Sequence, residues 1–417
     1  MKAKEEKIGK KASLALVSLG CAKNMVDLQV RVGNLLQEGY YLSSERDRAD
    51  VVIVNTCSFI AAAREEAEAE ITRALELKAK GNYGRVVVTG CYPQRYPRAK
   101  GKFPGVDEWR GVPKEWEESK TPGLRLTGKA FAYLKIAEGC AHRCAYCAIP
   151  SIRGRYRSRP VESIVAEAKA LIRSGCRELN VVAQDPMLYG IDMDGGWDLV
   201  RLLWELDKIR GDFWVRVLYS YPNEITEGFL DWLNRSKHAV KYVDVPLQHT
   251  DEKVLQKMNR ASAVEATRVA AEALRLAVSG VTLRTTIMTG FPGETEARFR
   301  AMLADLKRMQ FDHLGAFAFS PEAGTKAAKM PGRPSRAVAE AREKEVMAQA
   351  KAIWKVRSKR LIGAMQRALV VAPGVARLES QAPDVDGVCY VESDAVGEFI
   401  TVQICAVRGF DFEAIEV

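Results

Sequence analysis

Three cysteines within eight residues constrain this chain more than any other feature of its sequence. Cys140, Cys144 and Cys147 lie in the segment E-G-C-A-H-R-C-A-Y-C-A-I-P (138–150), with the spacing C-x-x-x-C-x-x-C. Thiolates are soft ligands that suit iron–sulfur clusters, zinc or copper, whereas a structural zinc ion takes four protein ligands. No fourth cysteine stands nearby, so the segment predicts a cluster in which one iron keeps an open position.

Two other interpretations of the triad stay open at this point. His142 could complete a Cys3His zinc site, although it lies inside the triad, where the loop would have to double back. A disulfide is disfavoured, because nine cysteines is an odd number in a long chain and no export signal is evident. A reducing cytoplasm is therefore the expected compartment.

Length and charge set the outer limits on fold and partners. At 417 residues and 47% hydrophobic content, the chain should form two or three domains. No apolar run approaches the roughly 20 residues of a membrane span, so no membrane contact is expected. The formal charge of +10 is unevenly spread, since Leu361–Val417 holds three arginines, no lysine and nine acidic residues. This acidic tail should be attracted to a basic partner and repelled by phosphates.

The first part of the chain alternates between expected strands (14–19, 51–54 and 86–88) and expected helices (24–37 and 60–78). This βαβαβ order predicts a doubly wound parallel sheet, in which ligands gather at the carboxyl ends of the strands. The cysteines of this region follow the three strands, whereas structural cysteines usually lie inside strands or on apolar helix faces. The sequence thus predicts a second three-thiolate cluster, on Cys21, Cys57 and Cys91.

The middle of the chain predicts six further β/α units. Apolar strands are expected at 133–137, 178–183, 214–219, 242–245, 283–289 and 314–319. Helices are expected between them at 161–174, 198–209, 225–234, 263–278 and 296–309. The pattern predicts a partial TIM-like (β/α)6 barrel, which places its chemistry at the carboxyl ends of the strands.

The last part of the chain predicts a small β module. A long helix is expected at 337–361, and short strands follow it at 368–371, 387–392 and 399–406. About 55 residues of this pattern suit a five-stranded, OB-like barrel. Many such modules bind RNA through basic faces, and an acidic one favours a basic protein.

These features together resemble the methylthiotransferases of the radical S-adenosylmethionine (radical SAM) superfamily, over nearly the whole chain. Several strings resemble the branch that modifies an aspartate of small-subunit ribosomal protein twelve. They are S-L-G-C-A-K-N-M-V-D (18–27), N-T-C-S-F-I (55–60), the triad segment extended to Gly154, A-Q-D-P-M-L-Y-G-I-D (183–192), P-L-Q-H (246–249) and G-F-P-G-E-T (290–295).

The chain also departs from that family pattern. Leu28 and Gln29 follow V-D where the family usually has serine and glutamate, and Pro186 and Met187 follow A-Q-D where it has threonines. A-R-L-E-S-Q (376–381) replaces the usual arginine-bearing string ahead of A-P-D-V-D-G. These departures concern substrate contacts more than chemistry, because all six expected ligands are present.

The resemblance implies three domains: a methylthiotransferase domain (1–127), a radical SAM domain (128–362) and a TRAM-like β barrel (363–417). It implies two [4Fe–4S] clusters. The cluster on Cys140, Cys144 and Cys147 would bind SAM and generate a 5′-deoxyadenosyl radical that removes hydrogen from the aspartate β-carbon. The cluster on Cys21, Cys57 and Cys91 would hold a cluster-bound sulfide, which a second SAM methylates before transfer.

Four residues are candidate SAM contacts, and each has a plainer alternative. Tyr146, between two cluster ligands, packs on the adenine or belongs to the core. Gly290 and Gly293 approach SAM with their backbone or serve only as turn residues. Gln184 follows the second barrel strand. No catalytic residue is assigned, because His249 is equally well explained as a satisfied hydrogen-bonding residue.

Four alternating arginines, at 153, 155, 157 and 159, would point to one side of an extended segment. They indicate a solvated edge or a contact to an acidic substrate or ribosomal RNA. Cys176, Cys389 and Cys405 are expected to be ordinary packing residues.

The expected partners are ribosomal protein twelve, free or in the ribosome, and a low-potential electron donor. Direct tRNA binding is not expected. Two alternatives remain: a methylthiotransferase acting on tRNA adenosine, and a non-enzymatic iron–sulfur protein that senses redox state or binds RNA.

Overall fold

The computed structural model describes residues 12–45, 47–260 and 271–417. The chain divides into two compact units: the first is Met1–Leu126 together with Ser151–Arg153, and the second is Thr127–Pro150 together with Gly154–Val417. The division into three domains at 127 and 362 stays a prediction.

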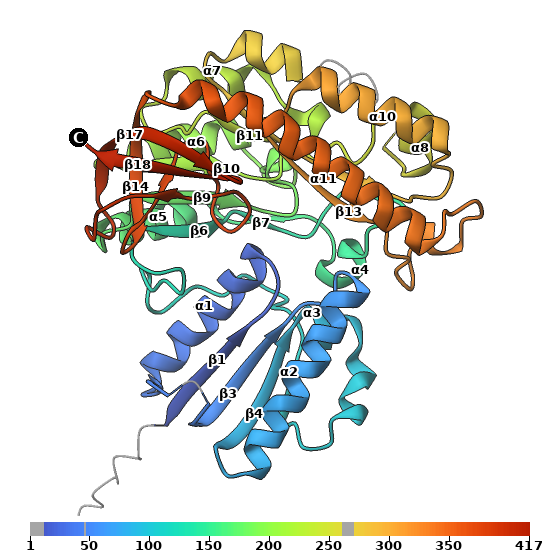
Figure 1. The fold of residues 1–417 in the computed structure, drawn as a ribbon. Helices are drawn as coiled ribbons and strands as arrows, with labels where there is room; N and C mark the ends of the chain where they lie inside the picture. The colour runs from blue at the N-terminus through green and yellow to red at the C-terminus, as the bar shows by residue number, and fades with distance from the viewer. Residues whose placement is uncertain (1–11, 46, 261–270) are drawn as a thin grey trace, which may run out of the picture. The chain divides into compact units, whose positions relative to one another are not determined.

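A five-stranded parallel sheet forms the centre of the first unit (Figure 1). Its strands are β1 (Ser13–Ser18), β2 (Tyr41–Leu42), β3 (Ala49–Thr56), β4 (Tyr83–Gly90) and β5 (Glu108–Arg110), in the order β2-β1-β3-β4-β5. All of its ladders are parallel, which confirms the doubly wound sheet. The edge strands β2 and β5 are too short to give a periodic signal in the sequence.

Helices α1 (Ala22–Gln37) and α2 (Ala61–Ala79) cover the two faces of this sheet. Val51 and Ile53 of β3 pack in one apolar cluster with α1 residues, and Val52 and Val54 pack in another with α2 residues. A strand buried on both faces needs apolar residues at successive positions, which explains the run V-V-I-V. The short helices α3 (Cys91–Arg95) and η1 (Pro97–Lys102) follow β4.

The second unit contains the expected six-stranded partial barrel. Its strands are β6 (Phe131–Lys135), β9 (Glu178–Val182), β10 (Trp214–Val217), β11 (Tyr242–Asp244), β12 (Thr282–Thr289) and β13 (His313–Ala318). They form two parallel three-stranded sheets, in the orders β10-β9-β6 and β11-β12-β13. All six predicted strands are confirmed.

Helices connect these strands, as the β/α pattern predicts. The predicted ones are α5 (Val161–Arg173), α6 (Leu199–Asp207), α7 (Glu227–Arg235) and α10 (Glu296–Met309). An additional helix, α8 (Glu252–Lys257), lies between β11 and β12, and the long helix α11 (Arg336–Ser358) follows the last strand of this barrel, as predicted. The predicted helix 263–278 lies partly outside the described residues, and 271–277 are helical. Shorter elements are β7 (Ala137–Glu138), α4 (Ile149–Arg153), β8 (Arg157–Ser158), η2 (Pro186–Leu188), η3 (Pro222–Glu224), η4 (Ala327–Lys329) and η5 (Lys359–Leu361).

Side-chain caps fix where several of these helices begin. The side chain of the residue before the helix accepts a hydrogen bond from a backbone N–H of the first turn, which would otherwise have no partner. The capping residues are Asp198, Thr226, Asp251, Thr295 and Ser335.

The C-terminal module is a closed five-stranded barrel, as predicted. Its strands are β14 (Met365–Ala372), β15 (Val375–Leu378), β16 (Cys389–Tyr390), β17 (Phe399–Arg408) and β18 (Asp411–Glu416), in the order β14-β15-β16-β18-β17. The register shifts between Val370 and Ala372 and between Ile404 and Ala406. Such bulges bend long strands, which helps a small barrel to close.

A buried ion cluster joins this C-terminal barrel to the six-stranded barrel. Glu178, the first residue of β9, pairs with Arg377 of β15 and accepts from Arg216 Nε at 2.8 Å. Glu178 and Arg216 are fully buried, and the side chain of Arg377 is 4% exposed. Burial alone would raise the pKa of Glu178, but the two guanidinium groups outweigh it and lower that pKa. The carboxylate therefore stays ionised in the core.

A second polar cluster lies at the same amino ends of the barrel strands. Asp386 pairs with Arg284 at 2.7 Å and accepts a hydrogen bond from the Tyr242 hydroxyl at 2.6 Å. Asp384 accepts from the Tyr133 hydroxyl at 2.5 Å. Two of the nine acidic residues of the tail thus face the six-stranded barrel, while four others are exposed: Glu392, Asp394, Glu398 and Glu416.

The atypical string A-R-L-E-S-Q lies at this junction. Arg216 Nη1 donates to the Glu379 carbonyl oxygen at 2.7 Å, and His313 Nε2 lies 2.6 Å from the Ser380 carbonyl oxygen. Gln381 is fully buried. The departure from the family pattern therefore falls on contacts with the six-stranded barrel.

Replacing Asp386 with asparagine should reduce the acid sensitivity of the second unit. Burial alone would raise the pKa of Asp386, but the charges of His313 and Arg284 outweigh burial and lower it. Such a carboxylate stabilises the fold above its unfolded pKa of about 3.9, and this stability disappears as the pH falls through the lower folded pKa. In that range the free energy of unfolding should fall by up to about 1.4 kcal/mol per pH unit because of this group.

Urea unfolding between about pH 2.5 and 4.5 measures this slope. Glu392→Gln, which removes an exposed carboxylate of the same module, is the matched control and should keep the wild-type slope. Equal slopes in the wild type and the Asp386→Asn variant would contradict the assignment.

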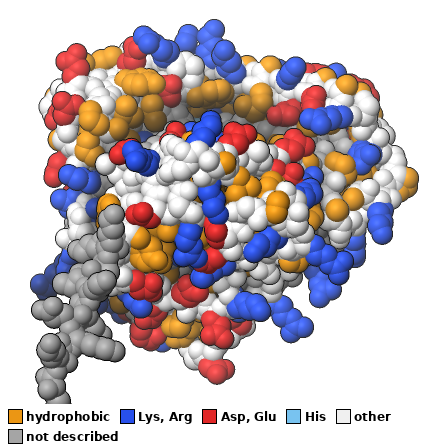
Figure 2. Space-filling view, turned by 90° about the horizontal axis from the view of Figure 1, so that it is seen from below, with side chains coloured by type: hydrophobic (Ala, Val, Ile, Leu, Met, Phe, Trp, Pro, Cys, Tyr) orange, Lys and Arg blue, Asp and Glu red, His pale blue; other side chains and the backbone are white. Residues whose placement is uncertain are grey.

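Lys and Arg side chains are interspersed with Asp and Glu over the face shown in Figure 2. The net charge of +10 therefore does not appear there as one basic patch. Among the described residues, no helix is long and apolar enough to cross a membrane.

Candidate cluster sites at two cysteine triads

Cys21, Cys57 and Cys91 lie at one edge of the sheet in the first unit. Cys21 immediately precedes α1, Cys57 follows the last residue of β3, and Cys91 follows the last residue of β4. The parallel register pairs Ser18 with Asn55 and Thr56 with Gly90, so the strands end together. From β1 the chain adds β2 on one side and β3, β4 and β5 on the other, so the topological switch point lies between β1 and β3. Ligands of such sheets bind at this point.

Two glycines leave room for this triad. Gly20 and Gly90, each directly before a cysteine, have φ values of +94° and +98°, a region that favours glycine. A Cβ on Gly20 would lie 2.9 Å from Cys57 Cβ and 3.4 Å from Cys57 Sγ. A Cβ on Gly90 would lie 2.6 Å from the Thr56 carbonyl oxygen. The repeated Gly-Cys pair is therefore a steric requirement of the site.

Buried amides tie the three strand ends together. Asn24 Nδ2 donates to the carbonyl oxygens of Leu19 and Thr56, at 2.8 and 3.1 Å. Asn55 Nδ2 donates to the Asn24 carbonyl oxygen at 2.9 Å. Each of these bonds joins Asn24 of α1 to the end of β1 or β3, and so holds the loops that carry the cysteines in place.

Arg153 also belongs to this site in the first unit. Its Nη2 lies 3.2 Å from Cys91 Sγ and 3.1 Å from Asn24 Oδ1, and its Nη1 lies 2.5 Å from Asp27 Oδ2. Burial raises the pKa of Cys91 to about 12, and the charge of Arg153 opposes this effect.

The row of four arginines expected from the sequence is wrong. Arg153 is buried at the end of helix α4, and Arg157 lies in the short strand β8. Arg159 pairs with Glu167 and donates to Ser163 Oγ at 2.8 Å. The segment changes from helix to strand at Gly154, so Arg153 does not share one face with the three arginines that follow.

The second triad occupies the loop between β7 and α4 in the second unit. Its first and last thiols are half-buried, and burial raises the pKa of Cys140 to about 11 and that of Cys147 to about 12. The backbone N–H of Ile149 points at Cys147 Sγ at 3.4 Å. The segment after α8 supports this loop, because Ala145 N donates to the Met258 carbonyl oxygen and Asn259 Nδ2 donates to the Arg143 carbonyl oxygen.

Within the described residues, no three His, Cys, Asp or Glu side chains converge as ligands of one metal ion. A cubane cluster places each thiolate on a different iron, so its ligands need not converge on a single point. The two sets of thiols, each with glycine or backbone N–H groups beside the sulfur atoms, fit such a cluster.

A stack of side chains lies beside the second triad that sequence reasoning missed. His142 stacks on Tyr221 with a centroid distance of 4.0 Å, and its Nε2 lies 2.6 Å from Asp185 Oδ2. The guanidinium carbon of Arg260 lies 4.2 Å from the centroid of the same Tyr221 ring, and Arg260 Nη1 lies 3.9 Å from Cys144 Sγ. Arg260 is 5% exposed, and its Nε has no hydrogen-bond partner among the described residues.

The four predicted SAM contacts lie at the carboxyl ends of the barrel strands or in the triad loop. Tyr146 packs on an apolar cluster and meets Phe291 edge-on at 6.3 Å. Gln184 donates to Glu138 at 2.7 Å, and its buried Oε1 has no partner among the described residues. A Cβ on Gly290 would lie 2.2 Å from Ala339 Cβ, and one on Gly293 would lie 2.6 Å from Lys257 Nζ. Packing thus explains both glycines, and their contacts to SAM stay predictions.

His249 has the contacts of a hydrogen-bonding residue. It is fully buried, and its Nδ1 accepts from the Asp251 backbone N–H at 2.9 Å. Its Nε2 lies 3.3 Å from Glu294 Oε2, but neither atom makes a hydrogen bond among the described residues. Glu294 Oε1 in turn accepts from Gly290 N at 2.9 Å and from Arg342 at 2.7 Å. The hydrogen bonds of Glu294 hold the G-F-P-G-E loop (290–294) in place.

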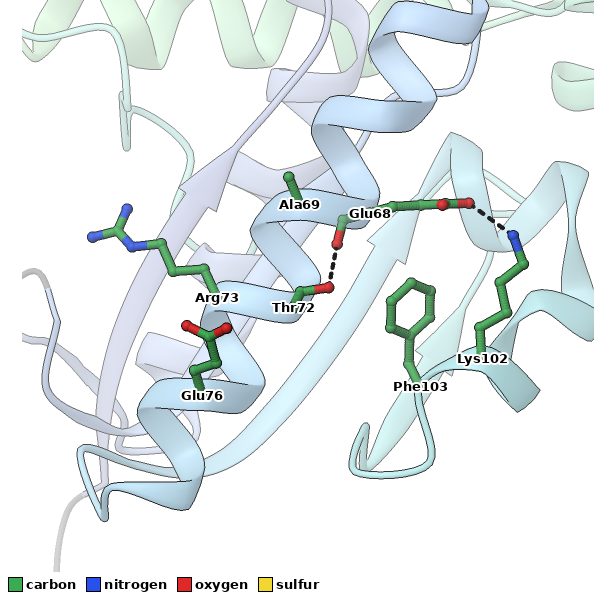
Figure 3. A pocket seen from close by; sticks show the side chains of 7 residues that line it. All are labelled: Glu68, Ala69, Thr72, Arg73, Glu76, Lys102 and Phe103. Carbon is green, nitrogen blue, oxygen red and sulfur yellow. Dashed lines mark hydrogen bonds and ion pairs between the residues drawn. The ribbon is translucent and has the colours of Figure 1, made fainter.

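Elsewhere in the first unit, a groove of about 500 Å³ lies along α2 (Figure 3). Lys102 Nζ pairs with Glu68 Oε1 at 3.2 Å at one end of the groove, and Arg73 and Glu76 also line it. No cysteine lines this groove, so it is separate from the triad.

Family models match three parts of the chain. The radical SAM superfamily matches residues 134–306, the uncharacterized protein family UPF0004 matches 13–111, and the TRAM domain matches 366–417. The ribosomal protein uS12 methylthiotransferase RimO of Geobacter sulfurreducens is 38% identical over 96% of this chain and 98% of its own length. That of Moorella thermoacetica is 41% identical over 94% of this chain and 96% of its own.

The chain belongs to the uS12 methylthiotransferase family. It is a radical SAM methylthiotransferase, and so the resemblance drawn from its cysteines and strings is confirmed. In this methylthiotransferase, the superfamily match covers Cys140, Cys144 and Cys147 and implies one [4Fe–4S] cluster and SAM.

Among solved structures, the radical SAM methyltransferase TsrM of Kitasatospora setae, with cobalamin and a [4Fe–4S] cluster bound, is similar with a TM-score of 0.55. The match covers 76% of this methylthiotransferase and 74% of that chain at 16% identity, so it shows the fold alone.

Proposed function

We propose that this methylthiotransferase adds a methylthio group to the β-carbon of an aspartate in ribosomal protein uS12, free or in the ribosome. Full-length similarity to enzymes named for uS12 carries the proposal. Under this proposal the reaction takes place in the cytoplasm, uses a low-potential electron donor and involves no direct binding of tRNA.

Both cysteine triads have a role in this proposal. Cys140, Cys144 and Cys147 hold the [4Fe–4S] cluster that binds SAM, and Cys21, Cys57 and Cys91 hold a second [4Fe–4S] cluster with its bound sulfide. When bound, the first group supplies the radical that removes hydrogen, and the second supplies the sulfur that is transferred. The loops, glycines and amides described above keep the two sets of thiols in place.

The side chains around the second triad orient SAM. Arg260, with one nitrogen unpaired and its guanidinium beside Cys144, suits a carboxylate held next to the cluster. Gln184 presents a buried, unpaired amide oxygen to an N–H donor such as an amino group. Tyr146, which is only partly buried and packs against the core residue Phe291, has an aromatic ring that suits the adenine.

Replacing Arg260 with glutamine should weaken SAM binding by roughly tenfold to a hundredfold, because a hydrogen bond to a charged group contributes about 1.5–3 kcal/mol. Arg143→Gln is the matched control, since this exposed arginine lies in the same loop. Anaerobic equilibrium dialysis with the reconstituted protein measures the affinity, and iron analysis verifies that the cluster is retained. Unchanged affinity in the Arg260 variant would contradict the role.

The proposed function is tested by anaerobic incubation with SAM, dithionite, sulfide and purified uS12, followed by mass spectrometry of the protein. The expected product carries one methylthio group on one aspartate, and uS12 with that aspartate replaced by alanine should remain unmodified. Modification of tRNA in a parallel reaction, with uS12 unmodified, would establish the tRNA alternative instead. No SAM cleavage, with both clusters assembled, would favour an iron–sulfur protein without this activity.

A further inference from the structure

Arg153 is an unusual residue to find beside a set of metal-binding thiols. It is 4% exposed, within the same unit as Cys91, which is 7% exposed, and Asn24, which is 1% exposed. A guanidinium group is always protonated in proteins, so this position carries a permanent positive charge in a nearly dry environment.

The partners of Arg153 fix its direction. Nη1 bonds to Asp27 at 2.5 Å, while Nη2 bonds to Asn24 Oδ1 at 3.1 Å and contacts Cys91 Sγ at 3.2 Å. Both Asp27 and Asn24 lie in the first turns of α1, directly after Cys21. The helix that begins at one cysteine therefore aims the guanidinium at another.

Ionised thiols give this site a net negative charge. Asp27 balances the charge of Arg153, and each thiolate of the triad adds a negative charge, which is most costly at Cys91 because this cysteine is buried. Hydrogen bonds to the sulfur atoms and the local charge are two of the factors that set the reduction potential of an iron–sulfur cluster.

We propose that Arg153 is a positioning residue of the Cys21–Cys57–Cys91 site, where its guanidinium holds the Cys91 thiolate and stabilises the reduced form of the cluster. The inference rests on the proposed second cluster. Reduction adds one electron to the cluster, and a fixed cation in contact with one of its thiolate ligands favours the more negative, reduced state. Loss of this cation should therefore lower the reduction potential.

The test uses the full chain with Cys140, Cys144 and Cys147 replaced by alanine, so that only the other triad can hold a cluster. Arg153→Gln, which removes the charge, and Arg153→Lys, which keeps it, are compared in this background. Anaerobic titration with dithionite in the presence of redox mediators, followed by electron paramagnetic resonance, measures the potential of each protein. Iron and sulfide analysis measures cluster content independently of activity.

We expect Arg153→Gln to make reduction about tenfold less favourable, which is about 59 mV for one electron. Arg153→Lys should retain most of the wild-type potential. Asp27→Asn, which removes the counter-charge and leaves the guanidinium, should shift the potential in the opposite direction.

Equal potentials in the glutamine variant and its parent, at equal cluster content, would overturn the inference and leave the second cluster in place. The same shift in the lysine and glutamine variants would also overturn it, because the charge would not be responsible. A parent protein that assembles no cluster would overturn the proposed second cluster, and this inference with it.

Discussion

Replacing Cys91 with alanine is expected to abolish methylthio transfer while leaving SAM cleavage intact. Cys91 is a ligand of the proposed second cluster, and the SAM-binding triad lies on a different segment of the chain. Iron content after reconstitution should fall from about eight atoms per chain to about four, since each [4Fe–4S] cluster contributes four. Chromatography of 5′-deoxyadenosine and mass spectrometry of uS12 measure the two activities separately.

Two further variants make this experiment decisive. Cys144→Ala should abolish both SAM cleavage and transfer, because it removes a ligand of the first cluster. Cys405→Ala should change neither, since Cys405 is an exposed cysteine of the C-terminal barrel. Methylthio transfer that persists in the Cys91 variant would exclude the second triad from the reaction.

Replacing Arg377 with alanine should destabilise the second unit by roughly 3–5 kcal/mol, the cost of leaving one partner of a buried ion pair alone. Glu178 would then keep only Arg216 as a charged partner, with its carboxylate still fully buried. The C-terminal barrel would lose its most buried charged contact with the strands of the larger barrel. Urea unfolding at neutral pH measures the change in free energy.

Arg408→Ala is the matched control for this variant. Arg408 pairs with Glu413 at 2.7 Å in the same small barrel, but its side chain is 77% exposed. An exposed pair contributes about 0–1 kcal/mol, so this variant should be nearly as stable as the wild type. Comparable losses in the two variants would show that burial of the Glu178 cluster has no special effect on stability.

The grouping of the six cysteines into two sets could be predicted from the sequence, because each cysteine lies in a local pattern. Cys140, Cys144 and Cys147 are close in the chain, and the other three follow strands whose apolar runs are evident on their own. The twelve strands predicted in the three regions produce the same kind of local signal. Parallel strands then bring their carboxyl ends to one edge, so strand ends far apart in sequence could be grouped correctly.

Residues whose partners lie far along the chain could not be found in this way. Arg153 contacts Cys91, 62 positions earlier, and Arg260 contacts Cys144, 116 positions earlier. Neither arginine belongs to a spacing that predicts its contact. For the buried ion clusters of the barrel, a signal was present in the sequence: polar residues stand inside apolar strands, such as Arg216 in W-V-R-V and Asp244 in Y-V-D. Side chains that face the inside of a barrel alternate along a strand in this way.

The three cysteines expected to be packing residues show the same limit. Cys176 and Cys389 are fully buried, as predicted, but Cys405 is exposed on β17. Alternation along that strand places Ile404 inside the small barrel and therefore turns its neighbour outward. The prediction for Cys405 is wrong because it did not use the alternation of Ile400, Val402 and Ile404 with polar residues, which turns Cys405 outward at the point where the register shifts.

The ion clusters at the base of the larger barrel also limit how freely its C-terminal module can be exchanged between relatives. Arg377, Asp384 and Asp386 each pair with a residue on a strand that lies more than a hundred positions earlier. A chimera that received a foreign module would bury charges without their counterparts. Exchange of the module between relatives should therefore succeed only when Glu178, Tyr133 and Arg284 are transferred with it as a matching set. The module and the barrel are then expected to change together in evolution.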